Sequence, residues 1–170
     1  MLGIKCLAWD PGSGYAVSPV SPAVWTGRVV RATCYKNQWT RGREAAPVER
    51  FETHPAPCWG CYCGIHALAD TLFLADYLAN SPLSDLLGSR LFSALLRASG
   101  VIIEHDIGWK AEEAEILAVG PAPTMFAYPL WAAREAGAAL GVPFFDNTAA
   151  MWSYAIEATR LAPEAQEEFR

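Results

Sequence analysis

The segment Gly100-Val-Ile-Ile-Glu-His-Asp-Ile-Gly-Trp-Lys-Ala-Glu112 decides the fold that we predict for this chain. Its β-branched residues, Val101 to Ile103, favour a strand, and Asp106-Ile107-Gly108 is typical of a tight turn. The apolar run Leu91–Glu104 fits a helix or a strand by periodicity alone, and its β-branched end favours the strand. Trp109–Val119 fits either a helix rich in Ala and Glu or an antiparallel strand. We expect the strand, and therefore a β-hairpin across the turn.

A second set of strand signals lies near the N-terminus. Ile4–Trp9 and Tyr15–Val17 flank the turn cluster Asp10–Gly14, and Arg28–Tyr35 is predicted to be a third strand. Two prolines and the break Trp25-Thr-Gly27 suit a loop or a sheet edge between the second and third strands. These elements predict a small antiparallel sheet.

Helices are expected in the remaining parts of the chain. Leucine and alanine at helical spacing predict a helix over His66–Ala79, and two more helices are predicted over Tyr128–Ala139 and Thr148–Leu161. The expected fold class is therefore α+β, a small antiparallel sheet with packed helices. Residues 1–120 are expected to form an α+β domain with a Cys/His cluster, and residues 121–170 a helical appendage packed on the same domain.

The composition limits the classes of protein to which the chain can belong. The 170 residues are 52% hydrophobic and 18% charged, which excludes a solvated tail, a coiled coil and a collagen-like repeat. The net charge of −5 argues against a nucleic-acid binder that acts by neutralising phosphates. No apolar run is long enough for a membrane helix, and the N-terminal segment lacks the features of a signal peptide. We therefore expect a cytoplasmic protein without a membrane partner.

The strongest chemical signal is a group of sulfur and imidazole side chains around a long polar loop, residues 36–57. Three of the five cysteines lie within six residues, which favours metal ligands over a disulfide framework. Tetrahedral zinc takes four such donors, and Cys-x-x-Cys and Cys-x-Cys spacings supply them in pairs. We expect a structural zinc ion that clamps the loop at its base and contributes its binding energy to folding. The candidate ligands are Cys34, His54, Cys58, Cys61 and Cys63.

Other interpretations of these side chains stay open. Free cysteines are often small buried hydrophobes, as we expect for Cys6. Cys58-Trp-Gly-Cys61 also has the spacing of a thiol redox motif, but such a motif takes a strand before it and a helix after it, and prolines precede this one. His66 is either a ligand, a hydrogen-bond partner of a ligand or a polar cap.

A second polar constellation surrounds the predicted turn. Acidic, imidazole and basic groups follow one another there, and the hairpin would bring His105 opposite Trp109 or Lys110 for general acid/base chemistry. A hydrated turn that carries charges is the competing interpretation. The residues concerned are Glu104, His105, Trp109, Lys110 and Glu112.

The chain resembles a family of small uncharacterised bacterial and bacteriophage proteins. The resemblance is carried by Cys61-Tyr-Cys63-Gly-Ile-His-Ala67, which matches Cys-x-Cys-Gly-Ile-Tyr/His-Ala, and by Glu104-His-Asp-Ile-Gly-Trp-Lys-Ala-Glu112, which matches Glu-His-x-x-Gly-aromatic-basic-Ala-Glu. It implies a ligand set of Cys34, His54, Cys61 and Cys63. Cys58 departs from the family pattern, so the fourth ligand is either His54 or Cys58.

The arrangement of that family is loosely similar to ADP-ribosyltransferase-like folds. The analogy implies an enzyme that uses a nicotinamide dinucleotide, with Arg31 and His66 as candidates to bind it and Glu112 as the candidate catalytic residue.

Three functions therefore compete. We favour a zinc-stabilised binding or regulatory module over the transferase, with the thiol redox protein third. Trp39, Trp59 and Trp109 are expected to form a recognition patch if they are exposed, and to belong to the core if they are buried. The expected partner is another protein or a second copy of the chain.

Overall fold

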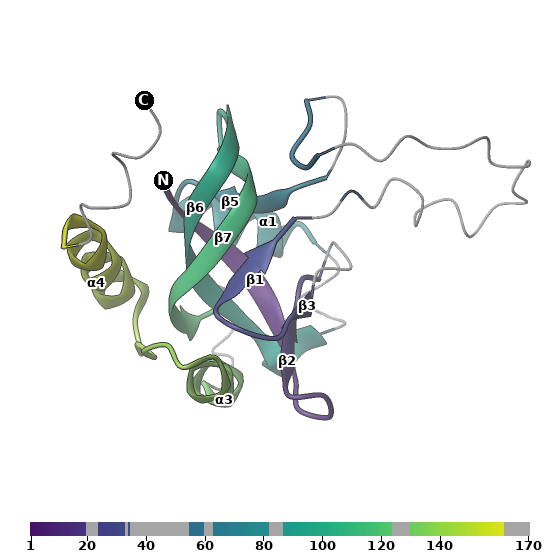
Figure 1. Ribbon diagram of the computed structural model, residues 1–170. Coiled ribbons are helices and arrows are strands. Elements are labelled where there is room, and N and C mark those ends of the chain that lie inside the picture. Colours follow the sequence, from purple (N-terminus) through teal and green to yellow (C-terminus); the bar gives the residue numbers. More distant parts are fainter. Residues whose placement is uncertain are drawn as a thin grey trace, which may run out of the picture.

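The structure, a computed structural model, describes a defined part of the chain: residues 1–19, 24–32, 34, 55–59, 63–81, 87–123 and 130–161. Within these ranges, seven strands form one mostly antiparallel sheet, and three α-helices pack beside it (Figure 1). The predicted α+β class is therefore confirmed.

Along the chain, the described strands precede the two C-terminal helices. The strands are β1 (Leu2–Asp10), β2 (Tyr15–Val17), β3 (Val24–Trp25), β4 (Val29–Arg31), β5 (Ile65–Leu68), β6 (Leu91–His105) and β7 (Gly108–Pro121). The helices are α1 (Thr71–Ala79), the 3-10 helix η1 (Gly88–Arg90), α3 (Trp131–Leu140) and α4 (Thr148–Arg160).

The predicted hairpin is the largest feature of the sheet. β6 and β7 pair from Phe92 and Pro121 at one end to His105 and Gly108 at the other, so that Asp106 and Ile107 form a two-residue turn. The ambiguous apolar run before the turn is thus a strand, because its residues pair along both edges. β1 is hydrogen-bonded to the opposite edge of β6 over Leu2–Ala8.

Four strands close into a ring. β5 pairs with β1 at Ile4 and Leu68, and with the first residues of β7, where Ile65 lies opposite Ala111. Since β6 also pairs with both β1 and β7, each of these four strands has two neighbours in the set. β2 and β3 extend the sheet beyond β1, and β4 pairs with β7 farther along the edge that β5 occupies.

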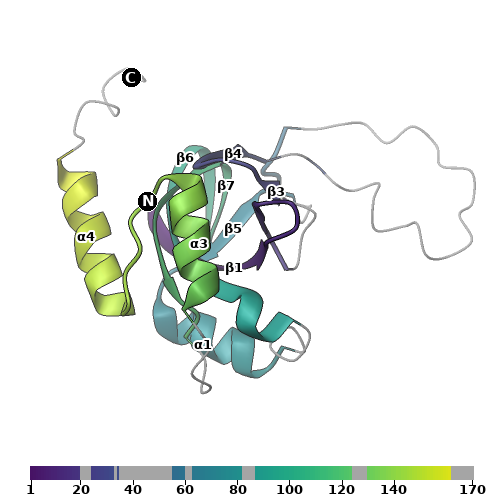
Figure 2. The same ribbon diagram turned by 90° about the horizontal axis from the view of Figure 1, so that it is seen from below.

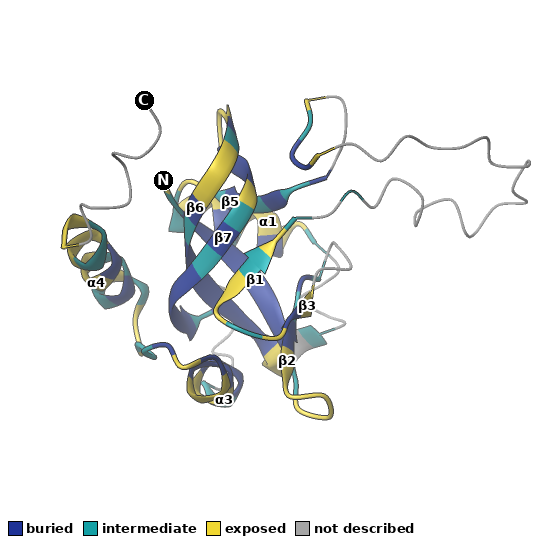
Figure 3. Ribbon diagram, viewed as in Figure 1, coloured by how far each residue is buried: buried dark blue, intermediate teal, exposed yellow. Residues whose placement is uncertain are grey.

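Two groups of buried side chains cover opposite faces of the strands. One contains Trp9, Trp25, Phe92 and Trp109 and is covered by the alanine-rich face of α3. The other is covered by leucines of α1 and by small and sulfur-containing residues of α4. Figure 2 shows α3 lying across the strands, with α4 to one side, and Figure 3 shows the buried residues concentrated in the middle of the sheet. Both C-terminal helices therefore share their cores with the strands.

A bulge in the hairpin depends on glycine. The register of β6 and β7 shifts between Ser99 and Ile102, and Gly100 there has φ +69°. A Cβ at this position would lie 2.6 Å from Oε2 of Glu112. The same carboxylate accepts a 3.2 Å hydrogen bond from the Val101 amide, which satisfies a group that the bulge removes from the ladder.

The helix predicted over His66–Ala79 is only partly correct. Residues from Ile65 to Leu68 form β5, because Ile65 and Ala67 point into the core and the backbone pairs with β7. The helix begins at Thr71, where the Asp70 carboxylate accepts a 2.9 Å hydrogen bond from the Phe73 amide.

Of the other predicted elements, one strand is shorter than expected and two helices are confirmed. The predicted strand Arg28–Tyr35 is shorter, Val29–Arg31. The two C-terminal helices are confirmed, with α3 ending at Gly141 in the left-handed conformation and α4 capped by Asn147. Among the described residues, no helix combines the length and apolar character that crossing a membrane requires.

Candidate functional site

A short cysteine-bearing segment, residues 55–59, lies against β5 and β7 near the hairpin turn. The ammonium group of Lys110 donates a 2.5 Å hydrogen bond to the carbonyl oxygen of Cys58, and Lys110 is only 3% exposed. Gly64 has φ +118°, and a Cβ there would lie 3.1 Å from Cβ of Pro57 and 3.3 Å from Cβ of Lys110. Glycine thus allows the segment, β5 and β7 to approach closely.

The two chain ends that border the long loop converge on one edge of β7. Arg31 of β4 lies opposite Glu113, and Ile65 of β5 lies opposite Ala111, only two residues away. The Ala32 amide extends this pairing, because it donates a 2.6 Å hydrogen bond to the Glu112 carbonyl. The described chain on the two sides of residues 36–57 therefore pairs with neighbouring positions of β7.

Three of the five candidate metal ligands lie in the described part of the chain. Cys34 follows Ala32 by two residues, Cys63 precedes Ile65 by two residues, and Cys58 is held by Lys110. Cys63 is buried, whereas Cys34 and Cys58 are half-buried. The other two candidates, His54 and Cys61, lie outside the described residues.

The donor chemistry of this group suits zinc. Thiolates and imidazole are the ligands of structural zinc sites. Two of the described cysteines, Cys34 and Cys63, lie near in sequence to strands that pair with the same edge of β7. Among the described residues, no three His, Cys, Asp or Glu side chains are grouped so that they could hold a metal ion, and this includes Cys34, Cys58 and Cys63. A complete set would therefore need both of the candidates outside the described residues, Cys61 and His54, or a closer approach of the described cysteines.

The cysteine at position 6 is a different case. It lies on β1 inside the core, and burial raises the pKa of its thiol to about 12. This confirms the prediction that Cys6 is a small buried hydrophobe.

The polar residues around the turn do not form the predicted pairs across the hairpin. His105 lies opposite Gly108 and Glu104 lies opposite Trp109, so the predicted pairing of His105 with Trp109 or Lys110 is wrong. Trp109 and Lys110 are consecutive residues of a strand, and their side chains leave opposite faces. Trp109 is 2% exposed and its indole N–H donates a 3.0 Å hydrogen bond to the Leu2 carbonyl.

The tryptophans of the predicted recognition patch differ in their exposure. Trp109 belongs to the core, Trp39 lies outside the described residues, and Trp59 is 75% exposed. The ring of Trp59 meets the imidazole of His105 edge to face, with 6.0 Å between the ring centroids. The cysteine segment and the end of β6 therefore share an exposed aromatic contact.

The residues considered for a transferase lie on neighbouring strands. Arg31 forms a 2.6 Å ion pair with Glu113, and this partner, with Glu112 nearby, raises the pKa of the guanidinium. The carboxylate of Glu112 accepts from the Val101 amide in the bulge, and His66 lies opposite Lys110. The side chains of Arg31 and Glu112 thus have structural roles in the hairpin and its edge.

The thiol redox interpretation lacks its structural context. A redox Cys-x-x-Cys motif gains its low thiol pKa at the N-terminus of a helix. Here β5 follows the cysteines, and the helix α1 begins only at Thr71.

One buried cation was missed by the sequence reasoning. Lys5 is 8% exposed, and its ammonium group donates a 3.1 Å hydrogen bond to the His66 carbonyl. Burial lowers the pKa of Lys5 to about 8. The available signal was the lone charge inside the apolar run Ile4–Trp9, which is the run of a buried strand.

Comparison with protein-family models, curated proteins and solved structures finds no match to this chain.

Proposed function

We propose that this protein is a zinc-stabilised binding module. The observation that carries the proposal is the exposure of Trp59 on an anchored segment. The carbonyl of the preceding residue, Cys58, accepts a hydrogen bond from the buried ammonium group of Lys110. A large aromatic side chain that is exposed on an anchored backbone loses little conformational entropy when it binds a partner.

The zinc ion would hold the base of the long loop. Its ligands would be Cys34, Cys61 and Cys63, with His54 or Cys58 as the fourth. This assignment is supported by the convergence of β4 and β5 on β7, which brings the chain on both sides of the loop to one place. When bound, zinc supplies no reaction here; it cross-links the chain, and its binding free energy stabilises the fold.

The proposed location is the cytoplasm. A reducing compartment keeps cysteines as thiols, and these lose their protons on binding zinc. The proposed partner is another protein or a second copy of the chain, which would contact Trp59 and His105.

Elemental analysis with a free-thiol count, before and after a chelator, tests the metal site. We expect about one zinc per chain, protected thiols, and a lower unfolding midpoint once the metal is removed. Cys34→Ser, Cys61→Ser and Cys63→Ser should each lose zinc. Cys6→Ala is the matched control, because Cys6 is a core residue, and it should keep the metal. Metal-free protein with freely reacting thiols would refute the site.

Comparison of two exposed apolar residues tests the binding surface. Sedimentation velocity over a range of concentrations, and pull-down from bacterial extract, would be run on the wild type, Trp59→Ala and Leu161→Ala. Leu161 at the end of α4 is as exposed as Trp59 and serves as the control. The proposal requires that only Trp59→Ala reduces association.

A further inference from the structure

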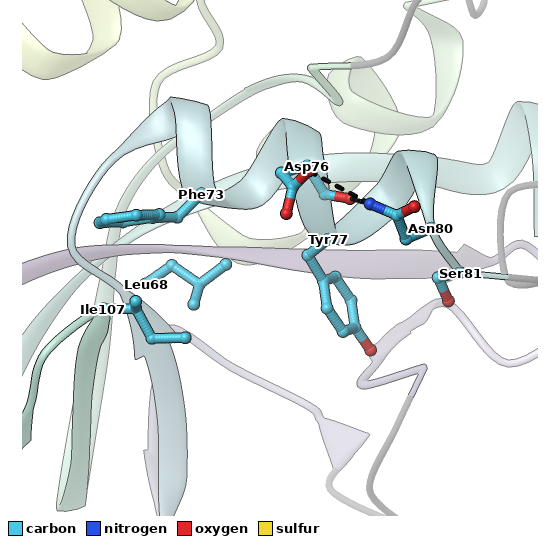
Figure 4. Close-up of a pocket in the computed structure, with 7 residues that line it drawn as sticks. All are labelled: Leu68, Phe73, Asp76, Tyr77, Asn80, Ser81 and Ile107. Carbon is cyan, nitrogen blue, oxygen red and sulfur yellow. Dashed lines mark hydrogen bonds between the residues drawn. The ribbon is translucent and has the colours of Figure 1, made fainter.

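A shallow groove of about 530 Å³ lies between α1 and the turn of the β6–β7 hairpin (Figure 4). Leu68, Phe73 and Ile107 gather at one end of the groove, and Tyr77 and Ser81 lie at the other. The floor is therefore mostly apolar, with hydroxyl groups at one end.

The hairpin turn is fixed against the start of the helix. The Ala69 amide donates a 2.9 Å hydrogen bond to the carbonyl of Ile107, just before Asp70 caps α1. The two walls of the groove are thus joined by backbone, and the groove is preformed rather than created by side-chain movement.

The apolar side chains of the groove face solvent although α1 also has a buried face. Leu74 and Leu78 fill the core, whereas Phe73, Tyr77 and Ile107 remain exposed. Phe73 and Tyr77 are four residues apart and so occupy the same side of the helix. Grouped exposed apolar residues of this kind mark interaction sites more often than scattered ones do.

Asp76 is the charged residue among the described residues that line the groove, and the charges adjacent in sequence to the lining residues are also negative. The stretches 68–81 and 104–107 contain no lysine or arginine and carry four carboxylates, on Asp70, Asp76, Glu104 and Asp106. The Asp76 carboxylate lines the groove and accepts a 3.1 Å hydrogen bond from the Asn80 amide, which orients it. An apolar floor with an acidic border is complementary to apolar side chains flanked by cations.

We propose that this groove binds a segment of a partner protein that presents apolar side chains flanked by lysine or arginine. Such a segment would place its apolar face on Phe73, Tyr77 and Ile107 and its cations beside the carboxylates. The mode is that of an amphipathic segment in a groove, with affinity from apolar burial and selectivity from charge. This proposal does not rest on the zinc site, because none of the groove residues is a candidate ligand.

Fluorescence anisotropy with designed peptides tests the proposal on the full chain. The probe is a fluorescein-labelled helical peptide of about 14 residues built from leucine and lysine, and the comparison peptide has glutamate in place of lysine. We expect the lysine peptide to bind at physiological salt and the glutamate peptide not to bind. Phe73→Ser and Ile107→Ser should each weaken binding about tenfold or more.

The neighbouring Leu72 offers a matched control. It is 80% exposed and does not line the groove, so Leu72→Ser should leave the affinity within about twofold. The double variant Asp76→Asn with Asp106→Asn should lower the affinity and flatten its dependence on salt. Circular dichroism and thermal unfolding of each variant would check that the fold is retained.

Three outcomes would overturn the proposal. The first is that neither peptide binds. The second is that Leu72→Ser and Phe73→Ser have the same effect: equal loss of binding would indicate an apolar contact outside the groove, and no loss in either would indicate unspecific charge attraction. The third is that the wild type self-associates in sedimentation and Phe73→Ser makes it monomeric, because a second copy would then occupy the groove.

Discussion

The buried ammonium group of Lys110 donates a hydrogen bond of 2.5 Å to the backbone carbonyl of Cys58, 52 positions away in the sequence. The bond ties the segment that displays Trp59 to the central hairpin. Because a hydrogen bond from a charged donor is stronger than one between neutral groups, this bond restrains the segment strongly.

Removing this donor should loosen the segment locally. Lys110→Met keeps the apolar stem and loses the ammonium group, and a hydrogen bond to a charged group contributes about 1.5–3 kcal/mol. We expect amide hydrogen exchange in residues 55–66 to become about tenfold faster or more. Glu104→Gln, an exposed change on the adjacent strand, is the control and should leave exchange unaltered. Unchanged exchange in Lys110→Met would show that other contacts hold the segment.

The buried Lys5 should make stability rise with pH. Its pKa is lowered from 10.5 to about 8, so between these values the unfolded chain binds the proton and the folded chain does not. The free energy of unfolding contributed by this group therefore increases from pH 8 to pH 10.5. Below pH 8 the buried charge costs about 3 kcal/mol, reduced by its hydrogen bond to the His66 carbonyl.

The variant Lys5→Met should accordingly be more stable than the wild type at pH 7, by about 1–3 kcal/mol, and the advantage should shrink towards pH 10.5. Urea denaturation of both proteins at several pH values measures this difference. A constant difference across the range would contradict the buried, titrating state of Lys5.

The buried thiol of Cys6 should make stability fall as the pH rises, which is opposite to the effect of Lys5. Its pKa is raised from 9.0 to about 12, so the stability it contributes is complete below pH 9 and is lost as the pH rises towards 12. In Cys6→Ala this alkaline loss should be smaller. The test is the same denaturation series extended above pH 9, and an equal loss in the variant would argue against a protonated buried thiol.

The two tryptophans at positions 59 and 109 should respond differently to truncation. Trp109→Ala should lower the free energy of unfolding by about 3–5 kcal/mol, because a fully buried indole leaves a large cavity. Trp59→Ala should change it by less than about 0.5 kcal/mol, since its ring is mostly exposed. Chemical denaturation measures both values. Similar losses would place Trp59 in the packed structure.

The bulge at Gly100 should not accept a side chain. Gly100→Ala places a Cβ against the Glu112 carboxylate at a positive φ, and we expect a loss of about 1–2 kcal/mol or more. In the Glu112→Ala background the clash with the carboxylate should disappear, whereas the 3.1 Å approach to the Cβ of residue 112 and the backbone part of the loss should remain. A double-mutant cycle measures the coupling, and strict additivity would exclude the contact.

The hairpin was the most predictable part of the fold. The β-branched run from Val101 to Ile103 and the turn that follows contain their own local signals, and the structure follows them with a register that ends at His105 and Gly108. The helical interpretation of His66–Leu68 failed for the opposite reason. Leucine spacing alone does not reveal that a neighbouring strand offers an edge for pairing, and here β7 does.

Within the candidate site, the sequence determined the ligand types and tertiary structure decided their neighbours. The cysteine spacing alone indicates a metal-binding group, because the chemistry of thiolates is local to the residues that carry them. Chain folding decided that Cys34 and Cys63 lie at the ends of two segments that pair beside each other on β7. It also decided that Lys5 and Lys110 are buried and Trp59 is exposed, since burial depends on which strands close the ring, and no single segment contains that information.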